Sequence, residues 1–219
     1  MRNRGRISVA LFGLALTLGT HASAAWQSLL QSRDINRDGI VDAYFDTSLG
    51  ITWLADSQAA TGSTFDDSPP FGPVGGLSWA SAMAWTAQLD VYGTTGWRLP
   101  TAFNKGGGLC SGRSCTGSEM GHLYFITLGN PGLVLQEAGP FLRLLGGQHW
   151  TSTTADSDSS VAWGFDFSNG EQRRSTKLGW VNAWAVHDGD VLATVPEPQS
   201  LTLVLLALGA GLLATKRTQ

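Results

Sequence analysis

The amino-acid sequence predicts an α+β fold in which two helices precede an antiparallel sheet. Two segments between residues 78 and 129 space their apolar residues as helices do, whereas the chain from residue 149 onward contains alternating strand-like segments. The 9 tryptophans all lie inside the chain, away from both ends and among frequent glycines. This combination indicates a loop-rich fold that is held together by a few large side chains.

The first helix is expected to begin after Ser78, whose hydroxyl can cap the free amides of the first turn. Ala82, Trp85 and Leu89 then fall on one face, and the helix should reach about Val91. The apolar face predicts that this helix packs against the body of the protein.

The second helix is expected to open at Thr116, because Thr116 and Glu119 have the spacing of a capping box. The apolar residues that follow recur at the intervals of one buried helix face; they are Met120, Leu123, Tyr124, Thr127 and Leu128. The segment 129–132 contains two glycines and a proline, which should end the helix.

Strands are predicted on both sides of the helices. Ala43–Asp46 and Ile51–Leu54 should form a short hairpin, and the loop-like segment 66–76 follows them. After the helices, strands are expected at 149–153, 161–167, 172–176 and 181–187. A tight turn at 168–170 should join the second and third of these four strands.

The N-terminal segment 1–25 has the three-part organisation of a cleavable signal peptide. Arg2, Arg4 and Arg6 precede an apolar run at 7–18, and the small residues of 22–24 suit signal peptidase. The chain is therefore predicted to be exported.

The C-terminal segment 200–219 contains a second apolar run, at 201–214, followed by Lys216 and Arg217. At about 1.5 Å per residue, the run is about 21 Å long, short of a hydrocarbon core about 30 Å thick. The preceding linker 191–199 holds Pro196, Glu197 and Pro198, which cannot continue a helix. We expect a temporary stop in the inner membrane with a cytoplasmic basic tip; a permanent single-span anchor is the alternative.

This order of Pro196-Glu197-Pro198, apolar helix and basic tip resembles the PEP-CTERM sorting signal. The resemblance implies that an exosortase recognises the tail and cleaves it, in a bacterium that makes extracellular polysaccharide. It implies delivery to the cell surface or the extracellular space and indicates no activity.

The Asp-rich segment 26–43 leads into a body, 44–190, that contains a series of short motifs in this order: Thr52-Trp53-Leu54, 79–89, Gly96-Trp97-Arg98-Leu99-Pro100-Thr101, His149-Trp150-Thr151-Ser152-Thr153, 162–170 and Ala183-Trp184-Ala185-Val186. Through this series the body is similar to the Lcl C-terminal domain family. The resemblance implies a C-type-lectin-like fold, in which two helices accompany a curled antiparallel sheet.

The charge of the body argues against nucleic acid as a partner. Of 14 basic residues, five lie in the terminal segments, and of 17 acidic residues only Glu197 does, so the body carries 9 − 16 = −7. A body this acidic repels phosphate backbones, which leaves cations and neutral polymers as the expected partners.

Cys110 and Cys115 are the only two cysteines of the chain, and in an exported protein they are expected to form a disulfide. The alternative, a metal site built on the two thiols, lacks a nearby histidine or further cysteine.

The segment 34–42 is the best candidate for a cation site. Asp34, Asn36, Asp38, the Ile40 carbonyl and Asp42 place oxygen atoms at every second position, as calcium loops do. The pattern departs from an EF-hand at its twelfth position, where a phenylalanine replaces the bidentate acid. The alternative is a turn rich in Asp and Asn that leads into a strand.

Trp97, Trp150 and Trp180 lie near loop boundaries, where they are candidates for stacking on sugar rings, although core packing is the default for each. Arg98 is open to two interpretations, an anion-binding residue or one that pairs with a body carboxylate and orders its loop. The acidic surroundings favour the second interpretation.

These observations predict an exported surface or matrix protein that binds exopolysaccharide or another envelope component without catalysis. No motif of nucleophilic or phosphate-transfer chemistry occurs in the sequence, so no catalytic residue is assigned. The alternatives are an enzyme that acts on extracellular polysaccharide and a structural coat protein without a discrete ligand.

Overall fold

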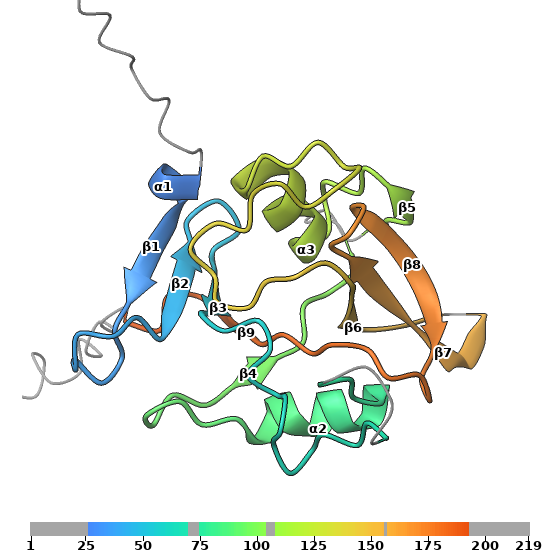
Figure 1. Ribbon diagram of the computed structural model, residues 1–219, viewed down its shortest axis with the longest axis horizontal. Helices are drawn as coiled ribbons and strands as arrows, with labels where there is room; N and C mark the ends of the chain where they lie inside the picture. Colours follow the sequence, from blue (N-terminus) through green and yellow to red (C-terminus); the bar gives the residue numbers. More distant parts are fainter. Residues whose placement is uncertain (1–25, 70–74, 104–107, 156, 193–219) are drawn as a thin grey trace, which may run out of the picture.

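Antiparallel strands joined by long loops make up most of the computed structural model, which describes residues 26–69, 75–103, 108–155 and 157–192 (Figure 1). The few helices are short, so the mixed α and β class expected from the sequence is confirmed. The predicted signal peptide, the Pro-Glu-Pro motif and the predicted sorting helix lie outside the described residues.

The first sheet has the strand order β1-β2-β3-β9-β4. Its strands are β1 (Leu30–Arg33), β2 (Ala43–Asp46), β3 (Ile51–Leu54), β9 (Val186–Asp188) and β4 (Trp97–Arg98), and the helical turn α1 (Trp26–Leu29) precedes β1. The predicted hairpin of β2 and β3 is confirmed, with Ala43 opposite Leu54 and Asp46 opposite Ile51. Strand β1 was not predicted, because its middle residues are exposed and polar.

The second sheet has the order β5-β8-β7-β6. Its strands are β5 (Gly112–Arg113), β8 (Glu171–Thr176), β7 (Asp158–Asp166) and β6 (Gln148–Ala155), and all neighbours are antiparallel. The prediction of one sheet was therefore wrong. The segment 181–187, predicted as a strand, is mostly a connection between the sheets, and only its end belongs to a strand, β9. Ala183, Trp184 and Ala185 of this connection are buried.

Helix α2 (Trp79–Gln88) begins where the sequence predicts, since the Ser78 hydroxyl accepts a hydrogen bond from the Ser81 amide at 3.3 Å. It ends three residues before the expected Val91, because Leu89 is extended and Val91 pairs with Thr94 in a turn. Helix α2 contacts both β4 and β6, and so packs against both sheets (Figure 1).

The second helix consists of one α-turn, α3 (Glu119–His122), continued by the π-helical segment η1 (Leu123–Thr127). Its N-cap is Ser118, which accepts a hydrogen bond from the Gly121 amide, so the predicted cap at Thr116 was wrong. The predicted apolar stripe is confirmed as buried in all its members: Met120, Leu123, Tyr124, Thr127 and Leu128. Among the described residues, no helix has the length and apolar character required to cross a membrane.

An aromatic cluster around Trp184 forms the centre of the core. Its ring centroid lies 4.8 Å from those of Trp53 and Phe141 and 5.8 Å from that of Phe167. His149 joins this cluster through an edge contact with Phe167 at 5.0 Å. Trp53 lies in β3 of the first sheet and His149 in β6 of the second, whereas Trp184 comes from the connection before β9, so the cluster holds the two sheets together.

His149 is fully buried, and burial lowers the pKa of its imidazole to about 4 from an ordinary value of 6.5, although the hydrogen bond that the Gly147 carbonyl accepts from the imidazole and the charge of Asp166 oppose the change. The neutral imidazole is therefore the form that the core accommodates. The unfolded chain takes up a proton below pH 6.5, whereas the folded protein takes it up only near pH 4.

We expect stability to fall as the pH drops from 6.5 to 4, by an amount on the order of 3 kcal/mol for complete titration of His149. His149→Gln should remove most of this dependence and lower the stability at neutral pH. Urea unfolding at a series of pH values measures both effects. His122→Gln is the matched control, and an unchanged pH dependence in His149→Gln would contradict this assignment.

Candidate functional site

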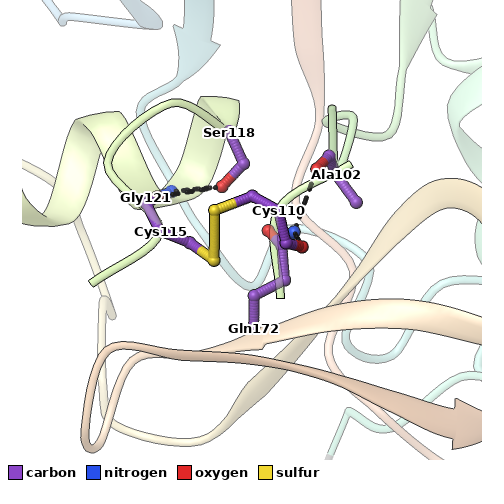
Figure 2. The surroundings of a disulfide bond; sticks show 6 residues. All are labelled: Ala102, Cys110, Cys115, Ser118, Gly121 and Gln172. Atoms are coloured by element: carbon purple, nitrogen blue, oxygen red, sulfur yellow. Dashed lines mark hydrogen bonds between the residues drawn. A yellow bond between two sulfur atoms is a disulfide. The ribbon is translucent and has the colours of Figure 1, made fainter. Parts of the chain in front are cut away.

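Cys110 and Cys115 are joined by a disulfide, with their Cα atoms 5.5 Å apart, so the predicted pairing is confirmed (Figure 2). The bond closes a ring that contains β5, and it lies next to the start of α3. A thiol metal site is excluded, since neither cysteine is free.

The Asp-rich segment folds as a turn in which its oxygen atoms hold backbone amides. Asp34 accepts hydrogen bonds from the amides of Asp38 and Gly39, at 3.1 and 2.8 Å, and Asp38 accepts one from Ile40 at 2.8 Å. Gly39 has a φ of 89°, the left-handed conformation that this sharp turn requires. These bonds fix the turn without a cation.

Asn36 and Asp42 complete the predicted ligand set. Asn36 bonds with Asp38, whereas the Asp42 carboxylate accepts the Ile35 amide at 2.7 Å. No cluster of three acidic, histidine or cysteine side chains able to hold a metal occurs within the described ranges. Calcium binding here stays a prediction, and it would require the carboxylates to exchange amide partners for the ion.

For calcium, we expect weak binding, with a Kd on the order of 10⁻⁴–10⁻³ M. Calorimetric titration of the full chain should give a binding isotherm that Asp38→Ala abolishes, because this residue supplies a central carboxylate. Asp90→Ala is the control, since Asp90 lies outside the loop and bonds to the Gly93 amide. Flat traces for the unaltered protein would remove the site.

Arg98 pairs with carboxylates of the body, as the second of its two interpretations predicts. Its two terminal nitrogens contact both oxygens of Glu119 at 2.9 and 2.7 Å, and Nη2 contacts Asp188 at 2.5 Å. Glu119 also accepts the Thr101 amide at 2.7 Å, which orders the loop after β4. Burial alone lowers the pKa of Arg98, but the bonds to Glu119 and Asp188 outweigh it and raise the pKa.

Replacing this arginine should destabilise the fold, because it leaves Glu119 partly buried without its partner. We expect Arg98→Met to lower the free energy of unfolding by about 2–3 kcal/mol. Arg143→Met is the matched control, since the pair of Arg143 with Asp56 is more exposed and is expected to contribute less than about 1 kcal/mol. Equal losses in urea unfolding would argue against the special role of Arg98.

Two of the three candidate stacking tryptophans are buried. Trp97 is 2 % exposed and Trp150 is 0 % exposed, so both pack in the core, the default for each, and neither ring is open to a stacking ligand. Their indole N–H groups donate to the carbonyls of Thr94 and Leu77, which explains their burial near loop boundaries. Trp180 remains, with 44 % of its surface exposed.

A pocket of about 610 Å³ opens beside Trp180, and we call it the Trp180 pocket. Its volume falls within the roughly 300–1,000 Å³ typical of small-molecule sites. The walls come from the loop before β6, the start of β6, β8, the connection after β8 and the loop after β3. They are formed by Gln58, Leu145, Gly146, Gly147, Gln148, Arg173, Trp180, Val181 and Asn182.

The ring of Trp180 is held in place at the pocket wall. Its indole N–H donates to the Asp67 carbonyl at 3.1 Å. The next residue, Val181, exchanges two backbone hydrogen bonds with Leu77, at 2.9 and 3.1 Å. The exposed ring is therefore preorganised, and a ligand that stacks on it need not order the backbone first.

Polar groups surround this ring. The Gln148 side-chain oxygen accepts a hydrogen bond from Ser175 at 2.9 Å, and its Nε2 has no hydrogen-bond partner among the described residues. Arg173 donates from Nη2 to Asp166 at 3.1 Å, and Asn182 is fixed through its backbone, whose carbonyl accepts the Trp150 amide. No sequence motif points to these polar residues; the paired glycines before β6 are the one local signal of an open turn.

A serine and a histidine also meet, between the β2–β3 turn and α3. The Ser48 hydroxyl lies 2.9 Å from His122 Nε2 and donates to Asp46 at 2.5 Å. Because the hydroxyl proton points to Asp46, His122 must donate to Ser48, the reverse of what an activated nucleophile requires. Asp46 is fully buried and also accepts from Thr127 at 2.9 Å, so this chain of bonds connects the hairpin to η1.

The chemistry available in the Trp180 pocket is therefore recognition by an aromatic face and by amide and guanidinium donors. Comparison with known proteins adds no candidate of its own: no protein-family description matches the chain, and no curated protein matches it.

Proposed function

We propose that this protein is exported and binds extracellular polysaccharide, without catalysis, in the Trp180 pocket. The single observation that carries the proposal is the exposed, fixed ring of Trp180 beside amide and guanidinium side chains. A flat aromatic face suits the apolar face of a sugar ring, and the surrounding donors and acceptors suit its hydroxyl groups.

The proposal of export rests on the signal-like segment 1–25 and on the tail that resembles a PEP-CTERM signal. In this account signal peptidase removes the first segment, and an exosortase acts on the tail while it rests in the inner membrane. The Cys110–Cys115 bond supports this destination, since disulfides persist in oxidising compartments. The mature protein then works at the cell surface or in the extracellular matrix.

We also propose that the body is an Lcl-type, C-type-lectin-like domain. The antiparallel sheets, the few helices and the long loops are compatible with that fold class. The Trp180 pocket is built by loops and strand ends, the parts of a fold that most often carry binding sites.

The test is binding to a glycan array that carries fragments of bacterial polysaccharides, with the full chain in detergent. We expect saturable binding, and we expect Trp180→Ala to weaken it by roughly 30-fold, equivalent to about 2 kcal/mol for a central aromatic contact. Leu178→Ala is the matched control, because Leu178 is more exposed and lies two residues away. It should leave binding unchanged.

The remaining outcomes separate the alternatives. Equal binding by Trp180→Ala and the unaltered protein would remove the pocket from the proposal. Release of soluble reducing sugars from the polymer would indicate an enzyme. Absence of binding to every glycan would favour a coat protein without a discrete ligand.

A further inference from the structure

Strand β5 is too short to hold its place by its own hydrogen bonds. It has two residues, Gly112 and Arg113, which pair with Gln172 and Glu171 of β8. Ordering a residue opposes folding by more than a typical backbone hydrogen bond contributes, so a strand of this length needs other support. The disulfide ring of Cys110 and Cys115 encloses β5 completely.

One end of the ring is anchored on β8. The Gln172 side chain is buried, and its Nε2 donates to the Cys110 carbonyl and, at 2.9 Å, to the Ala102 carbonyl (Figure 2). The Cys110 amide in turn donates to Ala102 at 3.4 Å. A single side chain of β8 therefore holds the entry to the ring.

The other end of the ring is anchored on α3. Cys115 is 1 % exposed, and its carbonyl accepts a hydrogen bond from the Ser118 hydroxyl at 3.3 Å. A Cβ atom placed on Gly121 would lie 1.7 Å from that carbonyl, so only glycine permits this approach of α3 to the ring. The disulfide joins this rigid end to Cys110 and thus to β8 (Figure 2).

The ring also contains backbone that resists this shape. Ser114 has a φ of 62°, a left-handed conformation that is unfavourable for a residue with a side chain. An open ring would be free to relax this residue, which lies next to Arg113 of β5. Release of the ring and loss of β5 are therefore expected to occur together.

β5 covers one edge of the four-stranded sheet. On the side of β8 that faces away from β7, β5 is its neighbour in the described structure, and it protects only Glu171 and Gln172. Without β5, the whole outer edge of β8 would present unpaired backbone groups, and such edges exchange amide protons and pair with other chains.

We propose that the Cys110–Cys115 disulfide is a redox lock on the edge of the second sheet: when closed it holds β5 on β8, and when opened it releases β5 and uncovers that edge. Opening requires a dithiol. One thiolate attacks the partly exposed Cys110 sulfur, and the Cys115 thiolate leaves. The second thiol then displaces Cys110, so the protein gains two electrons and two protons and the dithiol becomes a disulfide.

The lock also reaches the Trp180 pocket, and this consequence rests on the proposed function. Arg173 follows Gln172 in β8 and contributes to the pocket wall. Freeing the edge at Gln172 loosens the strand that positions Arg173. Reduced protein should accordingly bind glycans more weakly than oxidised protein, by a few-fold.

Hydrogen–deuterium exchange of the full chain in detergent, with and without dithiothreitol, tests the lock. Within 112–113 and 171–172, we expect reduction to raise at least tenfold the exchange rate of the amides that point from one strand of the β5–β8 pair toward the other, while the amides of β2 and β3 keep their rates. In Cys110→Ser/Cys115→Ser, these amides should exchange fast from the start, and dithiothreitol should have no effect. The double variant thus controls for any other action of the reagent, since the chain has no further cysteine.

Unchanged exchange in β5 and β8 after complete reduction, verified by mass, would overturn the proposal. If the double variant does not fold, reduced and iodoacetamide-alkylated protein replaces it, and general loss of protection across both sheets would show a staple for the whole fold instead of a lock on one edge. The glycan array is run in parallel on the oxidised and reduced forms. Failure of the oxidised form to bind refutes the proposed function and leaves the exchange result valid.

Discussion

Burial of the tryptophans, several of which donate their N–H groups to backbone carbonyls, is the constraint on which the rest of this structure depends. Trp150 of β6 donates to the Leu77 carbonyl, and Trp79 of α2 donates to the Thr151 carbonyl, both at 2.8 Å. These two reciprocal bonds fasten the start of α2 to β6. Trp184 similarly donates to the Leu54 carbonyl of β3 at 2.8 Å. Each of these three indoles contributes a large apolar surface and also satisfies a backbone carbonyl in another segment of the chain.

Sequence patterns predicted the elements that are determined by residues close together in the chain. The hairpin of β2 and β3 follows from two short apolar segments around a turn, and the start of α2 follows from the Ser78 cap. The division into two sheets depends instead on a contact across the chain, in which the Leu54 amide donates to the Ala185 carbonyl at 3.0 Å. No periodicity within a segment encodes such a contact, so the sequence indicated one sheet.

The difference between local patterns and contacts across the chain also separates the site residues that could be predicted from those that could not. Thr116 and Glu119 have the spacing of a capping box, but Glu119 lies within reach of Arg98, and a bidentate ion pair is stronger than a cap bond to an amide. The helix therefore begins at Ser118. Residues near loop boundaries resist prediction for a related reason, since Trp150 and Trp180 both lie near such boundaries in the sequence and have opposite exposure in the fold.

That contrast also explains why the pocket lies beside Trp180. The chain between β8 and β9 runs between the two sheets, where residues 181 and 182 are held by single bridges to Leu77 and His149. Because this segment has few backbone partners, it belongs to no regular strand at residues 181 and 182. Its polar side chains lie next to the open turn before β6. Trp150, which lies in β6, is buried in the core. Trp180 lies before the two bridged residues in the chain and remains exposed at the surface. The junction of the sheets is therefore the place where this fold combines a fixed aromatic side chain with polar side chains in one pocket, a combination that suits the recognition of a small polar ligand.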